Sequence, residues 1–151
     1  MSRLHKIIGC DNPERICDGV FVHGARKGPI RSWQARGAGP EDSFPYWLGQ
    51  DLPSVGVWSL AYESRFFVFQ GQRMPLMDQA LSALGDLEVE GFGERPIVFV
   101  AHSVGGLVVK QLLLHARDSQ QPKWTNILEH TKGVAFLSTP HSSVPRGSPY
   151  N

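Results

Sequence analysis

The 151-residue chain lacks several features that mark specialised classes of protein. Its two cysteines, Cys10 and Cys17, are too few for a disulfide framework and have no zinc-site partners beside them. No apolar run approaches the roughly 20 residues of a membrane-spanning helix. The first twelve residues show no signal-peptide core with a cleavage site. We therefore expect free thiols, no transmembrane segment and a cytoplasmic location.

The chain also lacks an excess of positive or negative charge. Lysine and arginine number 15 against 14 aspartates and glutamates, which gives a net charge of +1. Such a balance gives no global field for nucleic acid, and we expect no nucleic-acid partner. Basic residues do gather locally around Trp33, namely Arg26, Lys27, Arg31 and Arg36. This cluster is either a solvated loop or an anion-attracting rim near a substrate mouth.

The hydrophobic pattern alternates between short apolar runs and helical periodicity. The apolar runs predict buried parallel strands at 18–24, 55–61, 97–101 and 133–137. Helical spacing predicts helices near 44–52, 74–87, 104–116 and 124–128. This alternation predicts an α/β fold, with a parallel sheet of about four strands and helices on both faces. We divide the chain into an N-terminal extension (1–17), a domain (18–143) and an irregular tail (144–151).

One segment carries the chemistry, because a buried strand leads directly into Ser103 and a helix follows at once. In a nucleophile elbow, the serine sits on a strained strand-to-helix turn that lifts its hydroxyl clear of the sheet. Small residues must lie two positions before and two after it, and here they are Ala101 and Gly105. His102 and Gly106 complete the immediate surroundings of the predicted nucleophile.

An oxyanion hole is predicted from two backbone segments. The Val104 N–H lies at the N-terminus of the helix, where unsatisfied donors and the helix dipole favour negative charge. A second donor is expected from the Ala25 or Arg26 N–H, just after the strand that ends at His23 and Gly24. Glycine there allows the backbone to approach a substrate closely. His23 itself is interpreted as a structural hydrogen-bonding residue rather than a catalytic base.

These motifs resemble the lipase-like α/β-hydrolases that include serine-active-site-containing proteins and GPI-inositol-deacylase-like esterases. The segments that carry the resemblance are FVHG at 21–24 with Trp33 downstream, WLGQDLP at 47–53, PIVFVAHSVGGLVVKQ at 96–111 and KGVAFLSTPH at 132–141. The resemblance implies the N-terminal half of such a fold, without its C-terminal strands. It also implies hydrolysis of carboxylic or lipid esters through a Ser103 acyl-enzyme, with no metal or cofactor.

The family order places the triad acid and then the histidine after the serine. Asp118 and Glu129 follow Ser103, but neither lies at the end of a predicted strand. His141 does follow a strand, although it resembles a pocket position more than a base. Without a base, a serine hydroxyl is a poor nucleophile at neutral pH. We therefore expect little or no turnover from this chain.

The last predicted strand, 133–137, is expected to leave an open sheet edge. Such an edge can pair with a missing C-terminal half or with a protein partner. The alternative to an incomplete ester hydrolase is therefore a pseudoenzyme or interaction module that retains the hydrolase scaffold. Reactivity of Ser103 discriminates between the two readings.

Overall fold

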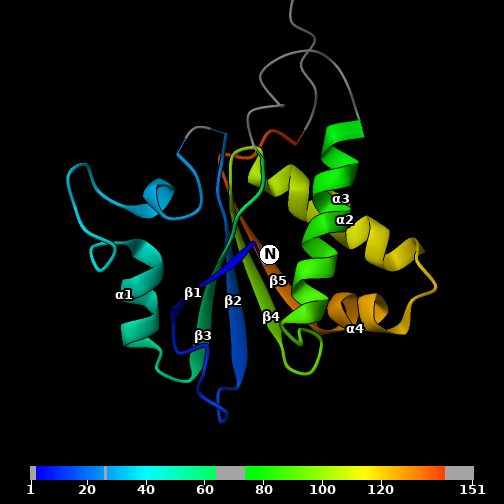
Figure 1. The fold of residues 1–151 in the computed structure, drawn as a ribbon, viewed down its shortest axis with the longest axis horizontal. Helices are drawn as coiled ribbons and strands as arrows, with labels where there is room; N and C mark the ends of the chain where they lie inside the picture. The colour runs from blue at the N-terminus through cyan, green and yellow to red at the C-terminus, as the bar shows by residue number, and fades with distance from the viewer. Residues whose placement is uncertain (1–2, 26, 64–73, 142–151) are drawn as a thin grey trace, which may run out of the picture.

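The computed structural model describes residues 3–25, 27–63 and 74–141, in which a five-stranded sheet carries helices on both faces (Figure 1). The strands are β1 (Leu4–Ile8), β2 (Cys17–Val22), β3 (Val55–Leu60), β4 (Ile97–His102) and β5 (Thr131–Leu137). The helices are η1 (Arg31–Trp33, a short 3-10 helix), α1 (Phe44–Asp51), α2 (Met74–Val89), α3 (Gly105–Asp118) and α4 (Pro122–His130). The predicted α/β class, its strands and its helices are confirmed.

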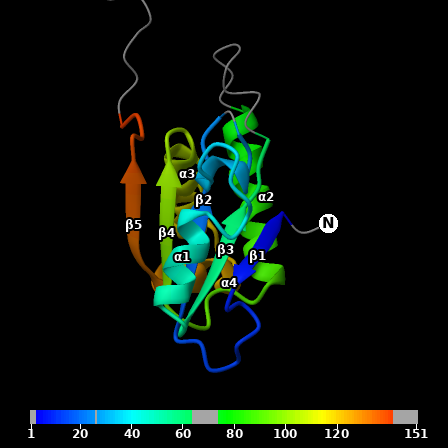
Figure 2. The ribbon, with the colours of Figure 1, turned by 90° about the vertical axis from the view of Figure 1, so that its left-hand side faces the viewer.

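The sheet has the strand order β1-β3-β2-β4-β5 (Figure 2). Strands β2 to β5 pair in parallel, whereas β1 runs antiparallel to β3. Strand β1 is one more than the sequence analysis expected, because it lies in the predicted extension. Its exposed His5 and Lys6 obscure the pattern of a buried strand. The strand lies at an edge of the sheet, where polar side chains are tolerated.

Apolar side chains fill the layers on both sides of the sheet. Helix α1 packs against β1 and β3 on one face, and α2, α3 and α4 cover the other face (Figure 1). Phe99, Leu112 and Ile127 are fully buried in the second layer. This core holds the end of β4 and the start of α3 in a fixed relation. None of the helices in the described ranges is long and apolar enough to cross a membrane.

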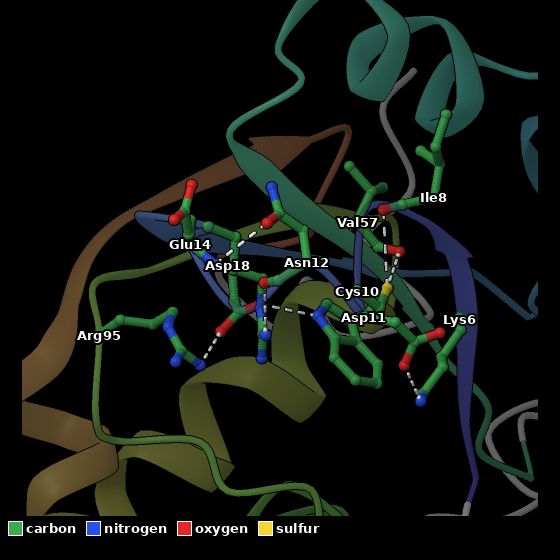
Figure 3. A network of polar contacts seen from close by, with 11 residues as sticks. Lys6, Ile8, Cys10, Asp11, Asn12, Glu14, Asp18, Val57 and Arg95 are labelled. Carbon is green, nitrogen blue, oxygen red and sulfur yellow. Dashed lines mark hydrogen bonds and ion pairs between the residues drawn. The ribbon is translucent and has the colours of Figure 1, made fainter.

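A buried carboxylate forms several polar contacts at the end of the sheet where the parallel strands begin. Asp18, at 1% exposure, accepts hydrogen bonds from Arg15 Nε (2.7 Å) and from the Trp58 indole (2.9 Å). Arg95 approaches its other oxygen at 3.6 Å (Figure 3). The Cys10 thiol lies nearby and donates to the Val57 carbonyl at 2.9 Å. Cys10 and Cys17 are both free thiols.

Candidate active site

Ser103 occupies a strained turn between β4 and α3. Its φ is +52°, in the left-handed region that non-glycine residues rarely adopt. The turn is fixed on both sides, because the Ser103 N–H donates to the Leu137 carbonyl (2.8 Å) and the Ser103 carbonyl accepts from Gly106 (3.1 Å). Strain at a residue with a reactive side chain is a feature of functional turns. This backbone has the conformation that the sequence predicted for an elbow.

Two small residues allow the turn to fit against the neighbouring strand. Ala101 is fully buried at the end of β4 and pairs with Val22. A methyl group on Gly105 would lie 2.6 Å from the Val22 carbonyl oxygen and would also meet the His23 carbonyl oxygen. Since both obstacles are backbone atoms, only glycine allows α3 to begin this close to β2. On the next residue, Gly106, a methyl group would meet the Thr139 side chain.

The register of β2 and β4 brings the second predicted loop to Ser103. Val22 pairs with Ala101, so His23 and Gly24 run beside His102 and Ser103. A methyl group on Gly24 would lie 3.1 Å from Ser103 Cβ and 2.9 Å from His102 Nδ1. Glycine at this position therefore keeps the space beside the serine side chain open.

His23 is buried and held by contacts within the protein. Its ring is buried, stacks on Tyr62 with centroids 4.5 Å apart, and has Nδ1 2.7 Å from the Gly24 carbonyl oxygen. Burial lowers the pKa of the imidazole below its usual value, and the hydrogen bond to Gly24 opposes that shift. A neutral ring with Nδ1 as the donor fits this arrangement. The ring thus fixes the Gly24 carbonyl of the loop beside Ser103.

A pocket of about 280 Å³ opens beside the serine. Its lining residues are Gly24, Ala25, Lys27, Ser32, His102 and Ser103. The Ser103 hydroxyl has no hydrogen-bond partner among the residues described, and neither does the Val104 N–H at the start of α3. An unpartnered hydroxyl and an unpartnered helix N-terminal donor thus belong to adjacent residues. No Asp or Glu of the described ranges lines the pocket.

The remaining predicted residues fall in different places. His141 does not line this pocket; its Nδ1 lies 2.7 Å from Lys110 Nζ, and its ring contacts Phe136. Ala25 lines the pocket, whereas Arg26 lies outside the described residues, as does the predicted tail. Within the described ranges, no cluster of His, Cys, Asp and Glu could hold a metal ion.

Two parts of the site were not predicted from the sequence. Ser32 of η1 lines the pocket, and no sequence motif predicted this. The residues after β5 also approach the elbow, since Thr139 packs on Gly106 and Ser138 has a φ of +54°. A second left-handed serine next to the elbow has no signature in the sequence. Both contributions depend on how separate segments meet in space.

Comparison with known proteins gives a consistent set of relatives. The chain is 31% identical to Protein SERAC1 of Danio rerio over 144 residues, and 30% identical to that of Bos taurus over 142 residues. Protein SERAC1 of Homo sapiens is 28% identical. Each match covers 82% of this chain, but the chain spans only about a fifth of each relative (21–22%). No protein-family model matches the chain.

Proposed function

We propose that this chain is the nucleophile-bearing part of a serine ester hydrolase of the lipase-like α/β-hydrolase class. Ser103 attacks a carboxylic or lipid ester and forms an acyl-enzyme. The observation that carries the proposal is the left-handed turn at Ser103, with φ +52°, between a buried strand and a helix. A strained backbone is retained where the geometry serves a purpose.

The oxyanion of the tetrahedral intermediate would be stabilised by the Val104 N–H at the start of α3. This donor combines a backbone hydrogen bond with the positive end of the helix dipole. The loop at Ala25 and Arg26 is the proposed source of a second donor. Gly24 supports this assignment, because a side chain at this position would crowd Ser103 Cβ and His102, so its absence leaves room for the loop beside the serine.

The alignments to Protein SERAC1 support the assignment of the segment. A match that covers 82% of a 151-residue chain includes Ser103 wherever it begins. The relatives are several times longer than this chain, so the activity of a whole protein of that kind stays a proposal here.

The reaction needs a base, and in a catalytic triad this base is a histidine that is hydrogen-bonded to a carboxylate. The described lining of the pocket does not supply such a pair. His102 lines it, but no carboxylate does. Loss of a triad member leaves roughly 10³–10⁴-fold catalysis over water from the remaining groups. We therefore propose that Ser103 reacts slowly in this chain and that a supplied base restores part of its rate.

The test is hydrolysis of p-nitrophenyl butyrate by the 151-residue chain across a concentration series of imidazole. The Ser103→Ala variant reports the background from imidazole itself, and circular dichroism checks that both proteins are folded. We expect a rate above that background that rises with imidazole and requires Ser103. Equal rates for the two folded proteins at every imidazole concentration would contradict the proposal. A Ser103-dependent rate that imidazole does not raise would place a working base within the chain, with His102 and His141 as the next substitutions.

A second candidate function is an interaction module on the same scaffold. The observation that favours it is the free edge of β5, which pairs only with β4 among the described strands. Leu137 on this edge is 40% exposed. Under this alternative a protein partner pairs with β5, and Ser103 stays unreactive even with imidazole present.

A further inference from the structure

A basic hollow lies next to the Ser103 pocket. It has a volume of about 750 Å³, and its charged lining residues are Lys27, Arg31 and Arg36. The amide of Gln34 lines it as well, and the remaining lining residues are small, namely Ala35, Gly37 and Ala38. Among the residues that the structure describes, no acidic side chain lines it. Three cations therefore surround this space with no carboxylate among them.

These three cations differ from the other basic residues that the structure describes. Elsewhere the basic groups have partners: Lys6, Arg15, Arg95, Arg117 and Lys123 pair with carboxylates, and Arg3, Lys110 and Lys132 have hydrogen bonds. Within the described ranges, Lys27, Arg31 and Arg36 form neither an ion pair nor a side-chain hydrogen bond. Unneutralised charges of one sign in a concave surface concentrate the field and attract an anion.

The hollow and the Ser103 pocket share a wall. Lys27 lines both of them. The first two residues of η1 divide between them, because Arg31 lines the hollow and Ser32 lines the pocket. Lys27 therefore contacts both spaces, and the two spaces are neighbours.

The loop that contains η1 is held against the sheet by several contacts. The Trp33 ring packs edge-on against Phe21, with centroids 5.0 Å apart, and faces His102 at 6.3 Å. The Ser59 hydroxyl of β3 donates to the Pro29 carbonyl at 2.7 Å. Gln34 forms an isolated β-bridge with Ser43. The loop is therefore anchored on both sides of η1, so the backbone that carries the three cations is already ordered before a ligand binds, which reduces the entropic cost of binding.

We infer that the basic hollow binds a carboxylate or phosphate group of the ester that Ser103 attacks, so that the substrate is an anionic ester. Arg31 and Arg36 suit this role, because a guanidinium matches either oxyanion with two parallel hydrogen bonds. The inference rests on the proposed function and adds the charge of the substrate to it. Under this inference the basic cluster is an anion-attracting rim rather than a solvated loop.

The kinetic test compares esters that share the p-nitrophenolate leaving group, in the presence of imidazole. One is the neutral butyrate, one is mono-p-nitrophenyl glutarate with a free carboxylate, and one has an acyl chain that ends in a phosphate. Each rate is corrected with Ser103→Ala. We expect the ratio of anionic to neutral rates to fall roughly tenfold in Arg31→Gln/Arg36→Gln, as two exposed ion pairs predict. The matched control Arg117→Gln, an exposed arginine on α3, should leave this ratio unchanged.

Ionic strength gives a second kinetic check. Since exposed charges are screened over about 10 Å at 0.1 M salt, added NaCl should lower the anionic-to-neutral ratio of the wild type. The ratio in the double variant should depend less on salt. A wild-type ratio that neither salt nor the two arginine substitutions changes would overturn the inference, even where Ser103 hydrolyses every ester.

A binding measurement separates this inference from the proposed function, because it needs no turnover. The Nε–Hε resonances of Arg31 and Arg36 should shift when glutarate or inorganic phosphate is added, whereas that of Arg117 should not. The glutarate and phosphate titrations distinguish a carboxylate site from a phosphate site. Shifts without any Ser103-dependent hydrolysis would refute the proposed function and leave an anion site. Absence of shifts would refute the anion site. A further outcome would also overturn the inference. If the two arginine substitutions weaken binding to anionic vesicles but leave the hydrolysis of soluble anionic esters unchanged, the two arginines form a membrane contact instead.

Discussion

The substitution Gly105→Ala probes the packing that forms the elbow. Gly105 is the first residue of α3, and an added methyl group would lie 2.6 Å from the Val22 carbonyl oxygen and against that of His23. Neither backbone atom can rotate away, so α3 must shift away from β2. Such overpacking costs about 1–3 kcal/mol. For a domain of this size, that corresponds to a fall in Tm of roughly 5 °C.

Gly85→Ala provides a matched control, because Gly85 lies within helix α2 and a methyl group there would meet no atom within 4 Å. Replacing an unconstrained helical glycine by alanine should stabilise the protein by about 0.5–1 kcal/mol. Urea unfolding followed by far-ultraviolet circular dichroism measures both variants. The two changes should have opposite signs. A Gly105→Ala protein as stable as the wild type would refute the argument that backbone contact at β2 fixes the elbow.

Three further predictions concern buried or strained groups. Asp18→Asn should cost about 3 kcal/mol of unfolding free energy, because it removes the charge from a buried ion pair, whereas Asp118→Asn, in an exposed pair, should cause no measurable change. Burial raises the pKa of the Cys10 thiol from 9.0 to about 11. Because the thiol then ionises more readily in the unfolded chain, the free energy of unfolding should be unaffected below pH 9 and fall as pH rises towards 11. Cys10→Ala should flatten this part of the pH profile. Ser138→Gly should raise the free energy of unfolding by about 0.5–1 kcal/mol, because φ +54° costs glycine nothing; equal or lower stability in chemical denaturation would argue against strain there.

Much of the fold follows from local patterns in the sequence. The run from Ile97 to Ala101 is apolar at every position, which fits the buried parallel strand β4 between β2 and β5. Helices α2 and α3 show the expected apolar stripes. Strand β1 escaped prediction, because Leu4–Ile8 is short, lies at an edge and contains two polar side chains. Its pairing with β3 is a long-range contact that no local pattern encodes.

Some parts of the candidate site also follow from local sequence patterns, whereas others depend on long-range contacts. Small residues at 101 and 105 around Ser103 predict an elbow, since crowding at such a turn depends on side chains close in the chain. The neighbouring basic hollow is less predictable. The sequence shows that Lys27, Arg31 and Arg36 are near one another, but only the path of the loop shows that they line a common space. His141 follows a strand as expected, yet its contact with Lys110 depends on how α3 packs beside β5.

The most direct test of the central claim is to react the chain with an alkyl fluorophosphonate in the presence of imidazole and to map the adduct by peptide mass spectrometry. In this reaction the Ser103 oxygen bonds to phosphorus and fluoride leaves. The account predicts one adduct per chain, on Ser103, formed faster as imidazole is added and absent from folded Ser103→Ala. An adduct on another serine, or none on Ser103 in a folded chain, would contradict the assignment of Ser103 as the nucleophile.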